Sequence, residues 1–379
     1  MKLSRRRVLA GLGGVPLAAA TGVPVGRRDR PAAPEEAPGS RRTTLLRGAD
    51  LVLTMDPRLG EGPLGTLENG VDLLLRHGAI EAVGRRLDAP PGARVVDAGG
   101  KIVLPGFVDL HNHLWQAALR GGCATSDLHG WLSGCNRATL PRIDARDMYR
   151  FVHLAALDAL QAGVTTVVDW VHPIPYATSE AYVRALDDAG PRFVYAACQN
   201  AADLALVTDV KKNLLDPLPL ASAQVAVHAG MTVRDELRQC RELARDLGVM
   251  LNSHVLEHRD DRRDDPIRAL REDAGIHPTL PAVLRMATLG GAECLGMADR
   301  IGSLTPGKRA DVVVLDPGTL NFAPRFDWTS QIVLNGQPPN VSEVYVDGYL
   351  RKSRGELLHV DTARVVREAE RAAARVRAA

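Results

Sequence analysis

The chain has 379 residues, an apolar fraction of 45% and a formal net charge of +2. This length suits one large α/β domain with a small second one, and the near-neutral charge gives no support for a nucleic-acid partner. The cysteines are odd in number and scattered, with no Cys-x-x-Cys pair, so neither a zinc knuckle nor a disulfide framework is predicted. They are Cys123, Cys135, Cys198, Cys240 and Cys294.

The N-terminal residues 1–42 predict an export signal followed by a linker. Ser4-Arg5-Arg6-Arg7-Val8-Leu9 resembles the twin-arginine export motif, and Ala18-Ala19-Ala20 offers a cleavage site after a short apolar stretch. That stretch is too short and too rich in glycine to span a bilayer, so we expect no stable membrane insertion. Residues 21–42 consist largely of Pro, Ala, Arg and Glu and predict a flexible linker. We therefore expect a periplasmic or extracellular protein.

Short β runs broken by Gly, Pro and Asp occupy residues 43–103. A second set of the same character follows the central region, at 310–316 and 342–346. Strands of like character near both ends of the chain predict one small composite β-sandwich, built from 43–103 plus 301–360. The segment 361–379 is rich in Arg, Glu and Ala, and its apolar residues recur at helical spacing, so it predicts a C-terminal helix.

Strands and helices alternate through residues 104–300. Apolar runs expected to be strands occupy 102–113, 164–170, 191–199, 223–229 and 249–254. Helices are expected at 145–162, 179–189 and 232–247. Repeated βα units predict a parallel sheet, so the fold class is α/β with a (β/α) TIM-type barrel. Only five of the usual eight units are recognised, which makes the predicted barrel incomplete.

Two histidines one residue apart end the first barrel strand. Because strand side chains alternate between faces, His111 and His113 point to the same side. Two imidazoles at the mouth of a buried strand can form half of a divalent metal site. Active sites of (β/α) barrels lie at the carboxyl ends of the strands. The residues at or just past such ends are His111, His113, Asp169, His172, His228 and His254.

Several motifs around this strand resemble the metal-dependent amidohydrolase superfamily. The first is Pro105-Gly106-Phe107-Val108-Asp109-Leu110-His111-Asn112-His113, and Gly163-Val164-Thr165-Thr166-Val167-Val168-Asp169 resembles the family's second strand. Residues 284–296 resemble its post-barrel helix, and 301–311 its return into the β-sandwich. The closest branch comprises cytosine deaminase, chlorohydrolases and triazine hydrolase. The resemblance implies a hydrolase that uses metal-activated water on carbon–nitrogen bonds other than peptide bonds, or on carbon–chlorine bonds, of a small heterocyclic molecule.

The same resemblance implies the metal ligands and a proton-transfer residue. His254-Val255-Leu256-Glu257 resembles the branch's fifth-strand His-x-x-Glu, which makes His254 the third ligand beside His111 and His113. Glu257 is then the catalytic residue that contacts substrate and moves a proton. The alternatives are a core histidine and an exposed loop acid. One divalent ion is expected, zinc first and iron second, since three imidazoles suit either, and such an ion lowers the pKa of bound water to about 7.

Further residues are predicted to contact a small-molecule substrate. His228 follows an apolar strand, where relatives in the branch place a substrate-binding histidine; a structural hydrogen bond is the alternative. Gln116 and Trp115 follow the metal-binding strand and are expected to line the pocket, although Trp115 suits a packing role equally well. Nucleoside deaminases of this branch carry a glutamate soon after the Trp-Leu of the first βα loop, whereas Ser-Gly follows Trp131-Leu132 here. This difference lowers the expectation of a nucleoside deaminase.

The family pattern breaks after His254. The family needs further βα units that supply a fourth histidine and an aspartate, and three units of about 30 residues each need about 90. Only residues 255–277 separate His254 from the helix that begins near Pro278. The hinge of the missing piece is expected within the charged run 258–265. Asp264 or Asp265 is a candidate to replace the absent aspartate, and a remnant of the segment after strand eight is the alternative.

Two hypotheses follow from this break. The first is an active metal-dependent hydrolase of the family, and the alternative is an impaired or inactive remnant that at most binds metal. A lactonase or phosphotriesterase fits less well, because such relatives bridge two metals with a carboxylated lysine at strand four, where this chain has His228. Five strands would leave open sheet edges, which favours association into a homo-oligomer.

Overall fold

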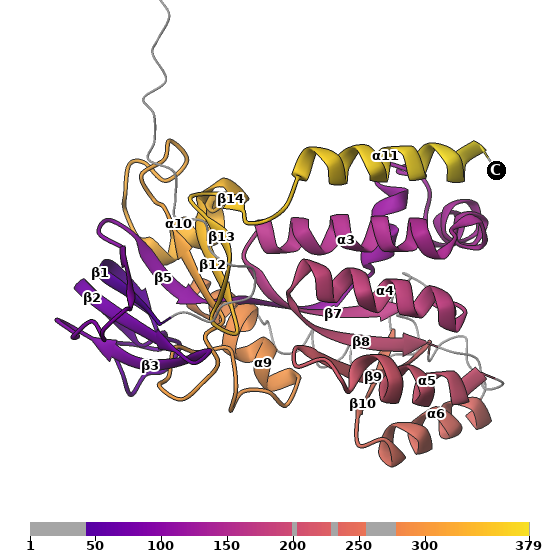
Figure 1. Ribbon diagram of the computed structural model, residues 1–379, viewed down its shortest axis with the longest axis horizontal. Coiled ribbons are helices and arrows are strands. Elements are labelled where there is room, and N and C mark those ends of the chain that lie inside the picture. The colour runs from indigo at the N-terminus through magenta and orange to yellow at the C-terminus, as the bar shows by residue number, and fades with distance from the viewer. Residues whose placement is uncertain (1–42, 199–202, 229–233, 255–277, 379) are drawn as a thin grey trace, which may run out of the picture. The chain divides into compact units, whose positions relative to one another are not determined.

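The computed structural model describes residues 43–198, 203–228, 234–254 and 278–378. The chain divides into the units Met1–Ala37 and Pro38–Ala379. The predicted signal peptide and linker lie outside the described residues. Two sheets, one of nine strands and one of five, make up the framework of the second unit (Figure 1). In the part of the chain that is described, no helix combines the length and apolar character needed to cross a membrane.

Both ends of the folded unit contribute strands to the nine-stranded sheet, as predicted. Its hydrogen-bonded order is β14-β13-β12-β11-β5-β1-β2-β3, and β4 pairs with β1. β5 joins the two halves, because it pairs in parallel with β1 and antiparallel with β11. The strands are β1 (Thr44–Leu53), β2 (Thr66–Arg76), β3 (Ala79–Gly84), β4 (Arg94–Asp97), β5 (Ile102–Pro105), β11 (Val312–Leu315), β12 (Val341–Val346), β13 (Tyr349–Ser353) and β14 (Glu356–Leu357).

Both faces of this sheet are apolar. Leu104 and Val313 belong to one core cluster and Val103 and Val314 to another, so alternate residues of β5 and β11 face opposite sides. At the far end, β3 meets the segment before β11, where the Ile80 N–H donates to the carbonyl of Lys308 (2.8 Å). A description as a two-layer sandwich, with the limits 43–103 and 301–360, stays a prediction.

The five-stranded sheet is parallel throughout, in the order β10-β9-β8-β7-β6. The strands predicted for the barrel are present, except that the run 102–113 divides into two strands: Ile102–Pro105 forms β5 of the other sheet, and only Phe107–Asn112 joins this one. The five strands of this sheet are β6 (Phe107–Asn112), β7 (Val164–Val171), β8 (Arg192–Cys198), β9 (Ala221–His228) and β10 (Met250–His254). Within the described residues, β6 pairs only with β7 and β10 only with β9, so the sheet is a half barrel with two outer edges.

Four helices connect the strands of the half barrel and cover its outer face. They are α3 (Ala145–Gln161), α4 (Tyr176–Ala189), α5 (Leu204–Val210) and α6 (Arg234–Asp246). Asp144 caps α3 by accepting from the N–H of Asp147 (2.8 Å), and α4 ends at Gly190, whose φ of 86° suits glycine. The predicted C-terminal helix is α11 (Thr362–Ala378), which lies along α3 and contacts Asp147 through Arg375 (Figure 1).

Alternation along β7 decides which of its side chains reach the inside of the half barrel. Val167 packs with the covering helices, whereas Val168 and Trp170 belong to the inner cluster. That cluster is closed by Ala292 of α9 (Gly291–Cys294) and by Ile301. The segment after the half barrel therefore covers the inner face of the five-stranded sheet.

Short helices fill the connections that the sequence left undefined. Between β6 and α3 lie η1 (Leu114–Leu119), α1 (Leu128–Trp131), η2 (Leu132–Asn136), α2 (Arg137–Thr139) and η3 (Leu140–Arg142). Elsewhere lie η5 (Lys211–Leu215), α8 (Leu280–Arg285), η7 (Met286–Gly290), α10 (Trp328–Asn335) and η8 (Pro338–Asn340). The stretch from η1 to η3 matters most, because it follows the two histidines directly.

Gly106 joins the two sheets and leaves no room for a side chain. A Cβ there would lie 2.0 Å from the Oγ1 of Thr165 and 2.6 Å from its Cβ. We expect Gly106→Ala to lower the free energy of unfolding by about 1–3 kcal/mol, because the packed sheet must shift. Gly84→Ala is the control, since its nearest neighbour would be the Leu87 Cδ2 at 3.6 Å. Urea denaturation of both variants checks this, and equal midpoints would contradict it.

Candidate metal centre and active-site pocket

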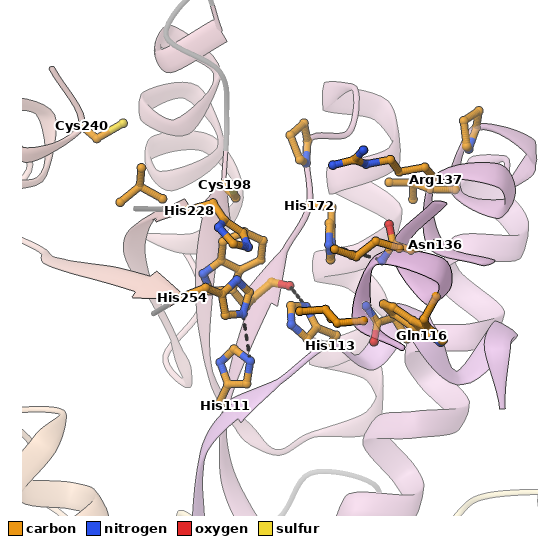
Figure 2. A pocket seen from close by; sticks show the side chains of 18 of the residues that line it. His111, His113, Gln116, Asn136, Arg137, His172, Cys198, His228, Cys240 and His254 are labelled. Carbon is orange, nitrogen blue, oxygen red and sulfur yellow. Dashed lines mark hydrogen bonds between the residues drawn. The ribbon is translucent and has the colours of Figure 1, made fainter. Parts of the chain in front are cut away.

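The structure brings the three predicted metal ligands together at the carboxyl end of the half barrel. His111 lies on β6 and His113 just after it, and His254 ends β10 at the opposite edge of the sheet. The candidate ligand atoms of the three side chains all lie within 4.8 Å of one another. The Nε2 atoms of His111 and His254 are 3.0 Å apart (Figure 2). The predicted cluster is therefore formed by the two outermost strands.

Backbone contacts fix the orientation of His113. Its Nδ1 lies 2.7 Å from the carbonyl oxygen of Trp170, and a carbonyl can only accept, so Nδ1–H donates. The lone pair of the neutral ring then sits on Nε2, which is free to bind a metal. Asp109 shapes the strand end by accepting from the His111 N–H (3.0 Å) and the Asn112 side chain (2.8 Å).

Asp169 anchors the chain that follows His113. It is fully buried and accepts from the Leu114 N–H (3.0 Å) and the Tyr182 hydroxyl (2.7 Å). Burial raises the pKa of Asp169 to about 7, although both hydrogen bonds act to lower it. Asp169 thus faces α4 rather than the cavity, and its role is to hold the loop in place.

Burial keeps His113 and His254 neutral. Burial and, to a smaller extent, the neighbouring imidazoles together lower the pKa of His113 to about 4 and that of His254 to about 3. His254 has 9% of its surface exposed. At neutral pH these rings therefore carry no charge, which is the state in which imidazole binds metals.

The residues present suit a zinc ion. A tetrahedral site with Zn–N bonds of about 2.0–2.1 Å places its nitrogens about 3.3 Å apart, close to the 3.0 Å between His111 and His254. The Nδ1 of His254 is buried with no hydrogen-bond partner in the described part of the chain. Among described residues the cluster holds three imidazoles and no carboxylate. Glu257, Asp264 and Asp265 lie outside the described residues, so their predicted roles stay predictions.

The cluster opens into a cavity of about 710 Å³. Gln116 and His228 line it, which places two of the three predicted substrate-binding residues beside the histidines (Figure 2). Trp115 does not line it: the side chain is 1% exposed and packs in the core behind the pocket wall. Its predicted contact with substrate has no support in this geometry. Residues from the η1–η3 stretch, among them Trp131, Asn136 and Arg137, form much of the wall.

A disulfide between Cys123 and Cys135 ties that wall together. The sequence predicted no disulfide framework, and this expectation was wrong for these two residues. The pairing depends on how the connection between β6 and α3 folds, which spacing alone does not encode. Cys198, Cys240 and Cys294 are free thiols.

We expect loss of this disulfide to destabilise the protein. Replacing Cys123 and Cys135 by serine should lower the free energy of unfolding by about 3 kcal/mol, because a short loop is released in the unfolded chain. Cys294→Ser is the control, since that thiol is exposed and unpaired. Thermal unfolding with and without a reductant checks the effect: reductant should lower the Tm of the wild type but not that of the double variant.

His172 is the pocket residue to which sequence reasoning assigned no firm role. It lies just past the end of β7, and its ring centre is 5.0 Å from that of His113. Burial lowers the pKa of His172 to about 3. Its position after a barrel strand was the available signal, but its partners come from the η1–η3 stretch, whose fold was not predicted.

Comparison with known proteins shows the family to which the chain belongs. A model of the amidohydrolase family matches residues 102–265 and 266–351. A 5-methylthioadenosine/S-adenosylhomocysteine deaminase of Pelotomaculum thermopropionicum is 24% identical over 442 positions, covering 88% of this chain and 98% of that protein. A 5'-deoxyadenosine deaminase of Methanobrevibacter smithii is 22% identical, covering 82% and 94%.

Solved structures share the fold. The atrazine chlorohydrolase of Arthrobacter aurescens complexed with zinc has a TM-score of 0.76 at 18% identity, covering 87% of this chain and all of that one. An adenosine deaminase of Xanthomonas campestris with bound zinc has a TM-score of 0.75 at 19% identity, covering 89% and 99%.

Two features of the alignments bear on the predicted shortening. The 442 aligned positions of the first deaminase exceed the 379 residues of this chain, so the alignment must contain gaps on this side. The two segments matched by the family model meet between residues 265 and 266. That junction lies at the end of the charged run 258–265, where the hinge of the missing piece was expected.

Proposed function

This chain belongs to the amidohydrolase family, and from that premise we propose a metal-dependent hydrolase that cleaves carbon–nitrogen bonds, other than peptide bonds, in a small heterocyclic amine. The observation that carries the proposal is the His111–His113–His254 cluster at the strand ends of the half barrel, open to a cavity of about 710 Å³. A cavity of this size accommodates a substituted purine or triazine.

We propose zinc as the resident ion. The zinc bound in the chlorohydrolase and in the adenosine deaminase supports this choice, and three imidazoles also suit iron as the second candidate. Such an ion would supply Lewis acidity and lower the pKa of a water molecule to about 7. His111, His113 and His254 would hold it, and the Trp170 carbonyl keeps the Nε2 of His113 available.

Proton transfer is proposed for Glu257, three residues after His254. The resemblance to the His-x-x-Glu of the family supports the role, and a carboxylate there would deliver a proton to the departing amine. His228 and Gln116 are proposed to contact the substrate, because both line the cavity beside the histidines.

Deamination is proposed ahead of dechlorination. The two curated relatives are deaminases of adenosine-type compounds, and they align over most of this chain. Likeness to the chlorohydrolase rests on fold at 18% identity. The absence of a glutamate after Trp131-Leu132 favours an aminated heterocycle other than the natural substrates of those relatives.

An impaired or inactive remnant is the second candidate. It is favoured by the half barrel and by a metal cluster that, among described residues, lacks a carboxylate. A water molecule at such a cluster has no described base to orient it. Such a protein would bind zinc and fold without turning over substrate.

A substrate panel separates the two candidates. Zinc-loaded protein is assayed for ammonia release from 5'-methylthioadenosine, 5'-deoxyadenosine and aminotriazines, and for chloride release from atrazine. We expect ammonia from at least one of these amines, and none with His113→Ala prepared in the same way. Stoichiometric zinc without any release would contradict the hydrolase and support the remnant.

We further propose that the protein is exported through the twin-arginine route. The N-terminal motif supports this, and so does the Cys123–Cys135 disulfide, because disulfides persist in oxidising compartments. Cell fractionation of the full chain, with Arg5 and Arg6 replaced by lysine as the control, tests it.

A homo-oligomer is proposed from the two outer edges of the half barrel. In the described residues β6 and β10 are each paired on one side, and Met250 and Leu251 on β10 are 46% and 38% exposed. Open strand edges of this kind favour association. Light scattering of the purified protein measures the oligomeric state.

A further inference from the structure

His172 stands on the pocket wall with a partner at each ring nitrogen. The Nε1–H of Trp115 lies 3.0 Å from Nδ1, and the side-chain amide of Asn136 lies 3.4 Å from Nε2. Asn136 is 3% exposed, and Trp115 is buried behind the wall. Figure 2 shows His172 facing Asn136 beside His113.

The partners decide which nitrogen of His172 carries the proton. Trp115 Nε1–H can only donate, so Nδ1 must accept and cannot hold a hydrogen. A neutral imidazole then carries its proton on Nε2. Asn136 can present either its NH₂ or its oxygen, because the two ends of an amide exchange on rotation. The atom 3.4 Å from Nε2 is the Nδ2 of Asn136, which can only donate. Because Trp115 already donates to Nδ1, the consistent arrangement has the Asn136 amide rotated by 180°, so that Oδ1 takes this position and accepts weakly from Nε2–H.

We propose that His172 determines substrate specificity by donating its Nε2–H to a lone-pair acceptor on the heterocycle, with Trp115 as the positioning residue that fixes the tautomer. This role rests on the proposed function. While no ligand is bound, Asn136 would accept the hydrogen bond from the Nε2–H of His172.

The position of His172 matches such a role. Its ring centre is 5.0 Å from that of His113, yet it is not part of the group of metal-ligating side chains. At this distance, a planar ring bound with its reacting carbon over the histidine cluster would have its edge within reach of His172. The contact from Asn136 is near the upper limit for a hydrogen bond, so a ligand acceptor can replace it.

The tautomer can be measured without any activity. ¹⁵N-histidine-labelled protein should show His172 protonated on Nε2 in long-range ¹H–¹⁵N spectra, with the signal assigned by its loss in His172→Gln. Trp115→Phe removes the donor and should allow the Nδ1–H form to appear. An Nδ1-protonated His172 in the wild type would overturn the proposal whether or not the enzyme turns over substrate.

The specificity role is tested with analogues of the amine on which the substrate panel shows activity. This amine is compared with analogues in which one of its ring nitrogens is replaced by C–H, using zinc-loaded protein. One replacement should lower kcat/KM of the wild type about 10-fold, and the same replacement should have no effect in His172→Phe. His172→Gln keeps an amide donor near the Nε2 position and should restore part of the discrimination.

Zinc content is the control for every variant of His172 and should stay at the wild-type level. Loss of zinc in His172→Phe would overturn the proposal, because the residue would then act as a ligand. Equal sensitivity of wild type and His172→Phe to every such replacement would also overturn it. A wild type with no activity toward any amine contradicts the proposed function instead, and the tautomer measurement still decides the geometry of His172.

Discussion

Replacing His113 by alanine is expected to reduce bound zinc from about one equivalent per chain to less than about half an equivalent. His113 is the ligand whose ring is held by a backbone carbonyl, so its Nε2 is preorganised toward His111 and His254. Without it, two imidazoles from opposite sheet edges remain, which is too few for a tight site among the described residues. Metal analysis after dialysis against zinc-buffered solution measures the change.

Thermal unfolding gives a second measurement of the same prediction. Zinc at about 100 times its Kd should stabilise the wild type by about 2.7 kcal/mol, whereas the His113→Ala variant should show no such gain. His153→Ala is the matched control, because His153 stacks on Tyr149 of α3 and takes no part in the cluster. Undiminished zinc in His113→Ala would refute the assignment of the cluster as a metal centre.

Loss of the Arg192 guanidinium is expected to have the largest effect on stability. Arg192 begins β8 of the half barrel, and its Nε and Nη2 donate to Asp311 at 3.0 and 3.3 Å. Nη2 also lies 3.5 Å from Asp347, which Arg309 contacts as well. Arg192, Asp311 and Asp347 are each at most 4% exposed. This network connects the half barrel with the strands β11 and β12 of the larger sheet.

Arg192→Met should therefore lower the free energy of unfolding by about 3–5 kcal/mol, because Asp311 loses its guanidinium while it remains buried. Arg192→Lys should lower the free energy of unfolding by a smaller amount, since an ammonium keeps the charge but cannot form the paired contacts. Arg120→Met removes an ion pair with Asp158 whose side chains are 54% and 61% exposed, and should lose about 0–1 kcal/mol. Urea denaturation compares the three variants, and similar midpoints for Arg192→Met and Arg120→Met would contradict the prediction.

Much of the fold could be predicted because apolar periodicity and glycine placement act locally. The strands at 164–170 and 249–254 were predicted within a residue of β7 and β10. The helix expected at 179–189 begins earlier, at Tyr176, directly after Pro175, which occupies the N-cap and whose missing N–H removes no helical hydrogen bond there. The His-x-His pair could be placed because strand alternation and strand-end chemistry need no tertiary information.

The pocket wall could not be predicted in the same way. The stretch from η1 to η3 consists of short turns without a single period, so neither the Cys123–Cys135 pairing nor the site of Asn136 could be derived. The contact between Trp115 and His172 joins residues 57 positions apart, and only the folded half barrel brings them together. Glu257 lies outside the described residues, and its role stays a prediction.

The strand origin of the metal ligands has a consequence for the half barrel itself. His111 and His254 come from its two outermost strands, yet their Nε2 atoms are 3.0 Å apart, so the sheet must curl until its edges meet at the carboxyl end. A metal ion bound by both residues would hold together two sheet edges that no described strand connects. The affinity of this cluster for a metal should therefore depend on how strongly the sheet is curved. Substitutions in the middle strands that flatten the sheet should weaken binding without touching a ligand.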